Sequence, residues 1–137
     1  SKFVSCVASK NNNEIMDKAI RIRKILGGAM RQVGVLAAAG LYALENHRYR
    51  LLDDHLRAKE ISNVLKSVNY ISKVETVETN IIIFQLNSVI NSTIFINMLR
   101  KKKILISDMG GGKLRIVTHL DYSEKMHKKV LETLKSI

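Results

Sequence analysis

Apolar residues recur every three or four positions along the first half of the chain, which is the spacing of helices that bury one face. After a short predicted strand at residues 3–9, three asparagines at 11–13 can cap a helix that ends at Gly27-Gly28. A second helix, apolar on nearly every face, is predicted from about Arg31 to Asn46, and a third from about Arg48 to Val68. We expect the second helix to lie in the core and the third to present its charged side chains to solvent.

The second half of the chain changes to the two-residue alternation of strands. Strands are predicted at residues 73–77, 80–86, 104–107 and 114–119, with a turn at the three glycines 110–112. Asn91-Ser92 and Ser123 can each cap a further helix, and the last helix should turn Met126, Val130, Leu134 and Ile137 inward. Helices followed by strands and two more helices predict an α+β fold, with an antiparallel sheet covered by helices on one face.

Length and composition are those of an ordinary globular chain, with 137 residues, 46% of them hydrophobic and 26% charged. The uncharged run Val33–Leu44 is too short to cross a bilayer, so no membrane association is expected. The chain opens at Ser1 without a methionine, which favours an internal cut over a natural start. Cys6 is the single cysteine, so no internal disulfide can form, and this suits the reducing cytoplasm.

The net charge of +11 is the one compositional outlier, and it raises the question of an anionic partner. Basic residues form runs at Lys18–Lys24 and Arg100–Lys103, but aromatic residues make up only 5% of the chain. A surface for stacking bases is therefore poorly supplied, and nucleic acid is not the expected partner. The four histidines lack metal-ligand spacing, and the glycines at 110–112 precede a strand rather than the helix of a phosphate loop.

One group of residues suggests anion binding. Lys24, Gly27-Gly28 and Arg31 would surround the start of the second helix with two cations and free backbone N–H groups. The alternative is a tight turn between helices with surface charges, and the local pattern favours neither. Arg115 shares one face of a predicted strand with Val117 and His119. Most arginines are simply solvated, and the local pattern alone gives Arg115 no other role.

Several blocks, in order, resemble the threonine aldolases of the aromatic amino acid β-eliminating lyase superfamily. The run from Arg21 to Leu44 resembles that family's signature Arg-Lys-x-Leu-Gly-Gly-Gly-Met-Arg-Gln-x-Gly-x-Leu-Ala-Ala-Ala-Gly. Arg50-Leu-Leu-Asp-Asp-His, Glu78-Thr-Asn-Ile and Leu114-Arg-Ile-Val-Thr-His-Leu-Asp resemble three later family blocks. The resemblance covers the chain from Ala19 onward and identifies it as the C-terminal portion of a low-specificity L-threonine aldolase.

This resemblance implies the C-terminal part of a fold-type I pyridoxal-phosphate enzyme, which cleaves L-threonine or L-allo-threonine to glycine and acetaldehyde. Residues 1–46 would be the end of the large cofactor-binding domain with its connecting helices, and residues 47–137 the small domain. Arg115 would hold the substrate carboxylate, Arg31 the phosphate of pyridoxal 5'-phosphate across a subunit boundary, and Lys24 would be a catalytic lysine. The resemblance also implies a small amino acid as substrate and a homodimer or homotetramer of the full-length protein.

The chain departs from the family pattern in two places. Ala29 replaces the third glycine of Gly-Gly-Gly, which restricts the backbone there. The lysine that binds the cofactor covalently in the family would lie just before Ser1, or else it is Lys2 with a glycine-rich loop deleted; the first needs no deletion. The sequence leaves open whether the chain is a piece of a longer enzyme or a degraded gene. A different class therefore remains as the alternative, an inactive remnant or a basic module that binds nucleic acid or another anion.

Overall fold

The computed structural model describes residues 13–137, and the predicted strand at 3–9, Lys2 and Cys6 lie outside the described residues. The chain divides into two compact units, one up to Arg48, here the helical unit, and one over Tyr49–Ile137, here the sheet unit. The sequence predicts this boundary between residues 46 and 47. Within residues 13–137, no helix is long and apolar enough to cross a membrane.

The helical unit contains α1 (Asn13–Ile25) and α2 (Gly34–Asn46). As expected, α1 ends at the glycine pair: Gly27 adopts a φ of 78°, and the N–H of Gly28 returns to the carbonyl of Arg23 at 2.8 Å. The second helix starts three residues later than predicted, since Gln32 has a φ of 54°, which no α-helix accommodates.

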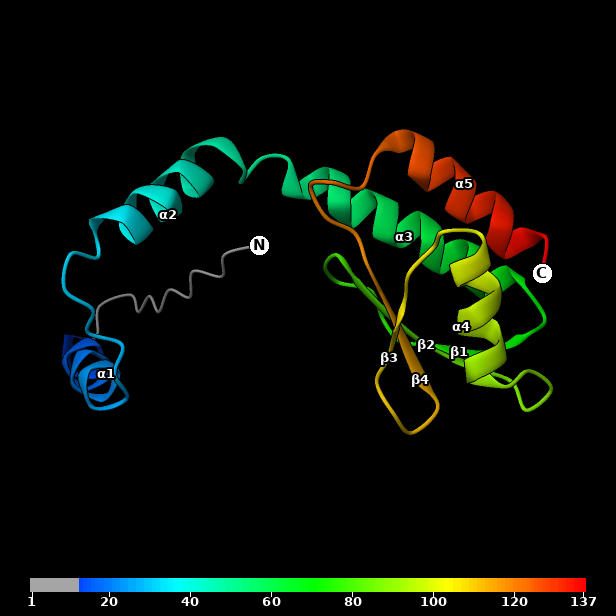
Figure 1. Cartoon of the computed structure of the whole chain (residues 1–137), viewed down its shortest axis with the longest axis horizontal. Coiled ribbons are helices and arrows are strands. Elements are labelled where there is room, and N and C mark those ends of the chain that lie inside the picture. Colours follow the sequence, from blue (N-terminus) through cyan, green and yellow to red (C-terminus); the bar gives the residue numbers. More distant parts are fainter. Residues whose placement is uncertain (1–12) are drawn as a thin grey trace. The chain divides into compact units, whose positions relative to one another are not determined.

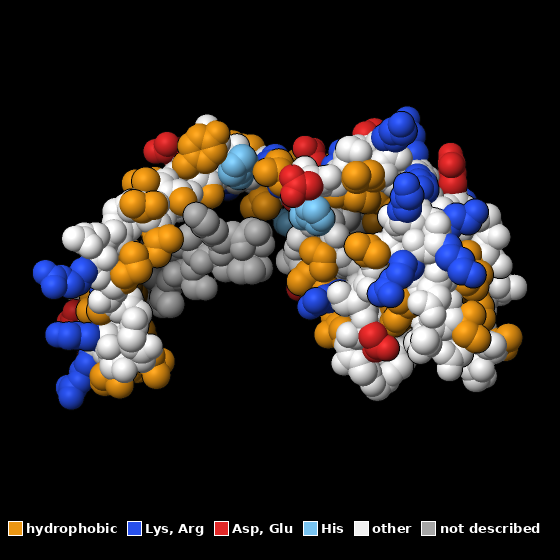
Figure 2. Space-filling model, viewed as in Figure 1, with side chains coloured by type: hydrophobic (Ala, Val, Ile, Leu, Met, Phe, Trp, Pro, Cys, Tyr) orange, Lys and Arg blue, Asp and Glu red, His pale blue; other side chains and the backbone are white. Residues whose placement is uncertain are grey.

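The expectation that the second helix forms the core is wrong for the described residues. Although α2 is apolar, it has no buried side chain, and α1 has none either. Leu41, Tyr42 and Leu44 are 59–61% exposed, and apolar side chains cover much of this unit's surface in Figure 2. Residue pattern alone therefore identified a helix that needs burial without identifying what buries it.

The sheet unit has the predicted α+β architecture. It begins with α3 (Leu51–Ser67), followed by β1 (Ile71–Val74), β2 (Ile81–Leu86), α4 (Ser92–Lys101), β3 (Ser107–Asp108), β4 (Lys113–Val117) and α5 (Glu124–Lys135). The strands form one sheet in the order β1-β2-β4-β3, and every neighbouring pair is antiparallel. Figure 1 shows α3 and α5 side by side along the sheet, with α4 next to them.

One hydrophobic core joins the helices to one face of this sheet. Ile82 and Phe84 of β2 pair with Ile116 and Leu114 of β4, so these four buried side chains share a face. The same core takes in buried residues from the three helices: Ala58, Ile61 and Leu65 of α3, Phe95 and Leu99 of α4, and Val130 and Leu134 of α5. Within Tyr49–Ile137 no helix packs on the opposite face of the sheet, which confirms helices on one face of the sheet in this unit.

Local chemistry explains where these elements begin. The side chain of Asn91 accepts hydrogen bonds from the N–H groups of Thr93 and Ile94, and that of Ser123 accepts from Met126, as expected of helix caps. All three glycines at 110–112 have positive φ, between 58° and 78°, and form the turn between β3 and β4.

Two side chains differ from prediction in their burial. Met126, predicted to face inward, is 53% exposed, and Asp54 of α3, predicted to be at the surface, is buried.

The predicted strands are longer than, or offset from, the observed ones. The strand predicted at residues 73–77 corresponds to β1, which spans Ile71–Val74 and has a register irregularity between Ile71 and Lys73. The third, predicted over 104–107, pairs with β4 only through Ser107 and Asp108. An apolar run therefore indicated extended chain but did not establish that it pairs.

Candidate functional site

Arg115 occupies the middle of the sheet, on the face without helices. It lies on β4, opposite Ile83 of β2 on one side and Ser107 of β3 on the other. Its strand neighbours Leu114 and Ile116 are buried in the core, so alternation turns Arg115 the other way, as predicted. The strand on either side fixes its backbone, and a side chain on such a rigid element is well placed to orient a ligand.

The guanidinium of Arg115 has unused hydrogen-bonding capacity. Its Nε is shielded from solvent yet has no hydrogen-bond partner, the one such buried side-chain atom among residues 13–137. None of the ion pairs within the described residues involves Arg115. An arginine that is partly buried and lacks a carboxylate partner suits a planar anion that can accept two hydrogen bonds.

A buried polar network holds the end of β4, three residues beyond Arg115. The hydroxyl of Thr118, 1% exposed, donates to the backbone carbonyl of Asp54 at 2.7 Å. The side-chain amide of Asn80 donates to the carbonyl of Thr118 at 2.7 Å, and the backbone carbonyl of Asn80 accepts a hydrogen bond from the N–H of Thr118 at 3.1 Å. Asp54 in turn accepts a hydrogen bond from Arg50 at 2.7 Å.

These four residues belong to three of the sequence blocks that resemble the family, and none of them was predicted as a site residue. Their contacts tie the start of α3 and the start of β2 to the end of β4. The network therefore positions the strand that carries Arg115. The sequence carried only an indirect signal for this network. Asp54, Asn80 and Thr118 each lie in one of the separate blocks that resemble the family.

A second buried cluster joins α5 to α3. His127 is 2% exposed; its Nε2 lies 2.8 Å from a carboxylate oxygen of Glu60 and its Nδ1 3.2 Å from the Tyr122 hydroxyl. Arg57 donates to the carbonyl of Tyr122 at 2.6 Å. Burial raises the pKa of Tyr122 to about 12 against a lowering effect of Arg57, so this phenol stays protonated at neutral pH. The cluster gives His127 a structural role.

In the helical unit, the backbone part of the predicted anion site is wrong. The N–H of Gly27 donates to the carbonyl of Lys24 at 3.2 Å and that of Gly28 to Arg23, because the glycines cap the end of α1 rather than the start of α2. A Cβ on Gly28 would lie 2.7 Å from Cγ of Arg23, so the turn is tightly closed.

The remaining donors of that site are the side chains of Lys24 and Arg31, both exposed. Lys24 carries three N–H donors and Arg31 five, and each can donate to a phosphate oxygen without help from the glycine N–H groups. Arg115 belongs to the sheet unit, whereas Lys24 and Arg31 belong to the helical unit. No group of three His, Cys, Asp or Glu side chains suited to a metal ion occurs within residues 13–137.

The fold defined by these elements is that of the C-terminal part of fold-type I pyridoxal-phosphate enzymes. A solved cystine C-S lyase, C-DES, matches with a TM-score of 0.58 at 15% identity, over 76% of this chain and 28% of its own. A decarboxylase from Sulfurospirillum multivorans matches with a TM-score of 0.57 at 16% identity, over 85% of this chain and 36% of its own. One C-DES structure contains glycine covalently linked to its pyridoxal-phosphate cofactor. The predicted fold class is thereby confirmed.

Within this class, the chain belongs to the beta-eliminating lyase family, whose model matches residues 6–88. It is 34% identical to the low-specificity L-threonine aldolase of Escherichia coli K12 over 119 residues, and 36% identical to low-specificity L-threonine aldolase 1 of Arabidopsis thaliana over 113 residues. These alignments cover 87% and 79% of this chain. The chain spans about a third of the length of these curated relatives, 34% and 31% respectively.

Proposed function

We propose that these residues form the C-terminal part of a longer lyase that cleaves L-threonine or L-allo-threonine to glycine and acetaldehyde with pyridoxal 5'-phosphate. The observation that carries this proposal is Arg115, a rigidly held arginine with a buried, unpartnered Nε on the open face of the sheet. The family and its threonine aldolase relatives supply the reaction class.

The role proposed for Arg115 is to bind and orient the substrate carboxylate. Two parallel N–H···O bonds fix the plane of the carboxylate and therefore the direction of the bond between Cα and Cβ. Bound pyridoxal phosphate would supply an electron-accepting ring for the pair released when that bond breaks. Because β4 is held at Thr118 by the polar network, the guanidinium keeps its direction between turnovers.

The helical unit would serve the other end of the ligand. Arg31 is proposed to bind the cofactor phosphate, in a neighbouring subunit of a homodimer or homotetramer, and its exposure leaves it free to do so. Lys24 is proposed as a catalytic lysine that exchanges a proton with the β-hydroxyl group. The exposed apolar helix α2 supports assembly, since an apolar surface of this kind requires cover.

A direct test uses the full-length protein that contains this chain, purified with pyridoxal phosphate and given L-threonine. Glycine and acetaldehyde should appear in equal amounts, and removing the cofactor should abolish both. The matched variants are Arg115→Ala and Lys113→Ala, which remove a cation from the same strand. Only Arg115→Ala should impair cleavage. A protein that binds the cofactor but leaves L-threonine intact would refute the proposed reaction.

The second candidate is a noncatalytic module that binds anions through its positive charge. Lys and Arg side chains gather over α4 and α5 (Figure 2), including the exposed run Arg100–Lys103. In that case DNA should bind with an affinity that falls steeply as salt increases, and pyridoxal phosphate should produce no visible absorbance. This pair of measurements separates the two candidates.

A further inference from the structure

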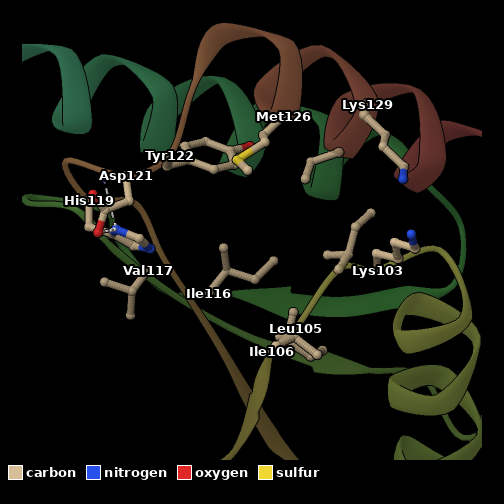
Figure 3. A pocket seen from close by; sticks show the side chains of 12 residues that line it. Lys103, Leu105, Ile106, Ile116, Val117, His119, Asp121, Tyr122, Met126 and Lys129 are labelled. Atoms are coloured by element: carbon tan, nitrogen blue, oxygen red, sulfur yellow. Dashed lines mark hydrogen bonds and ion pairs between the residues drawn. The ribbon is translucent and has the colours of Figure 1, made fainter.

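A groove of about 530 Å³ opens in the sheet unit, and Arg115 is not among the residues that line it. Its walls are β4, the chain leading into β3, and α5, and its floor is the side chain of Ile116 (Figure 3). Ile106, Val117 and Met126 add to an almost wholly apolar lining. This volume lies within the range of about 300–1,000 Å³ found for small-molecule pockets.

The groove exists because β3 pairs with β4 for only two residues. Ser107 is the first residue of β3 and pairs with Arg115, and the preceding residues Ile104–Ile106 lie outside the sheet. The two segments diverge from that point, as Figure 3 shows, and leave Ile116 and Val117 accessible from the side. Val117 and Met126 are consequently 40% and 53% exposed. A ligand that covered these apolar side chains would gain free energy by removing them from water.

Charge is arranged unequally along the groove. Lys103 and Lys129 stand at one end, while His119 and Asp121 stand at the other, with the apolar residues between them (Figure 3). Asp121 lies 3.8 Å from His119, so the carboxylate has a partner. Among residues 13–137, no ion pair within 4.0 Å involves Lys103 or Lys129. The lysine end of the groove therefore presents two uncompensated cations beside an apolar surface.

The backbone of Lys103 gives independent weight to that end. Lys103 has a φ of 62° in the left-handed position that closes α4, and the N–H of Ile104 returns to the carbonyl of Leu99 at 3.0 Å. Glycine is the usual residue at this position, because a side chain there carries a conformational penalty. The chain nonetheless places a lysine there, with its ammonium group at the mouth of the groove.

We propose that this groove binds a small amphiphilic anion, a medium-length hydrocarbon chain ending in a carboxylate. The hydrocarbon would cover Ile116, Val117 and Met126, and the carboxylate would lie between Lys103 and Lys129. This site is separate from the one proposed for the lyase reaction and does not depend on it. Other occupants fit the charge less well: residues 1–12 contain two lysines and no acidic residue, and a second copy brings a net charge of +11.

The test is a calorimetric titration of the chain with hexanoate, octanoate and decanoate, together with octanol and octylammonium. Each added methylene should raise affinity by up to about three- to fourfold until the groove is full, after which the gain should stop. Octanoate should bind more tightly than octanol, and octylammonium more weakly than either. NMR signals of the Ile116 and Met126 methyl groups should shift, while those of α2 should not.

Three variants make the result specific. Lys103→Gly should weaken octanoate binding about two- to fivefold, the value of one exposed ion pair, and yet raise the folding equilibrium constant by a similar factor. Met126→Glu should abolish binding by placing a carboxylate among the apolar side chains. Lys101→Ala removes the same charge from the same exposed run without lining the groove, and it should leave affinity unchanged.

The proposal is overturned if Lys101→Ala weakens binding as much as Lys103→Gly does, because attraction would then come from net charge alone. It is equally overturned if affinity rises with chain length without limit, or if the shifted signals belong to α2. Failure of octanoate to bind, with sedimentation showing dimers that Met126→Glu dissociates, would assign the groove to a second copy instead. Each of these outcomes leaves the lyase assignment untouched.

Discussion

The ion pair between Arg50 and Asp54 gives the sharpest prediction about stability, because its two partners differ in burial. Nη2 of Arg50 lies 2.7 Å from Oδ1 of Asp54, and the aspartate side chain is 2% exposed against 22% for the arginine. Replacing Arg50 with leucine leaves a buried carboxylate without its cation. Losing one partner of a buried pair costs about 3–5 kcal/mol, and the partial exposure of Arg50 places this case near 3 kcal/mol.

Removing both charges should cost less than removing one. In the double variant Arg50→Leu/Asp54→Leu no charge remains buried, so the loss should fall to about 1 kcal/mol or less. The backbone carbonyl of Asp54 still accepts the Thr118 hydroxyl in both variants, because neither substitution changes it. Lys73→Met is the control, since it breaks an exposed pair with Glu75 and should cost about 1 kcal/mol at most.

Native-state amide hydrogen exchange of β2 and β4 is the suitable assay. The slowest amides of these central strands report the free energy of unfolding of the sheet unit, whatever the helical unit does. If the double variant is as unstable as Arg50→Leu, or if Arg50→Leu matches Lys73→Met, the Arg50–Asp54 pair is not the buried support described above.

Three further outcomes follow from the described contacts. Burial raises the pKa of Tyr70 to about 12 from 10, so the folded protein holds this proton more tightly than the unfolded chain; stability should be constant below pH 10 and fall as pH rises towards 12, by about 3 kcal/mol. Urea unfolding at pH 8 and pH 11.5 checks this, and Tyr70→Phe should reduce the difference but leave the part due to Tyr122, whose pKa is also raised to about 12. Gly111→Ala, at a φ of 58°, should cost the sheet unit about 1 kcal/mol in the same exchange assay, while no added clash is expected. In the full-length protein, Arg31→Met should raise the dissociation constant of pyridoxal phosphate at least about tenfold and Arg21→Met should not, as measured by cofactor absorbance after dilution.

Much of the fold follows from periodicity and capping chemistry. The alternation in β2 and β4 correctly separated Ile82 and Ile116, which are buried, from Arg115 on the other face. Asn91 and Ser123 act as helix caps where their sequence neighbours predicted them. These features are local, so a single sequence contains the information that determines them.

The errors share a different cause, since each depends on contacts between distant residues. Asp54 was expected at the surface because charged side chains are seldom buried. In the structure its burial is compensated by the ion pair with Arg50. Ile104–Ile106 has the composition of a strand, yet it leaves β4 and borders the groove. The apolar pattern of α2 predicts burial, but none of the side chains of this helix is buried in the described structure.

The candidate site divides in the same way. Sequence resemblance selected Arg115, Arg31 and Lys24, and the strand pattern alone placed Arg115 on a face suited to binding. The pattern could not reveal that the N–H groups of Gly27 and Gly28 cap the end of α1. A glycine pair between two helices is compatible with ending the first helix or with starting the second. Nor could it reveal the polar network at Thr118, in which Thr118 and Asp54 are 64 residues apart in the sequence.

The central claim is that Arg115 binds the substrate carboxylate, and one comparison tests it most directly. In the full-length protein, kcat/KM should be measured for L-threonine and for L-threoninamide, which lacks the negative charge, with and without Arg115→Ala. A charge-assisted hydrogen-bonded pair is worth about 1.5–3 kcal/mol, so the substitution should reduce kcat/KM for L-threonine by about 10- to 150-fold. The account predicts a much smaller loss for L-threoninamide. An equal loss for both compounds would mean that Arg115 supports the fold rather than the substrate.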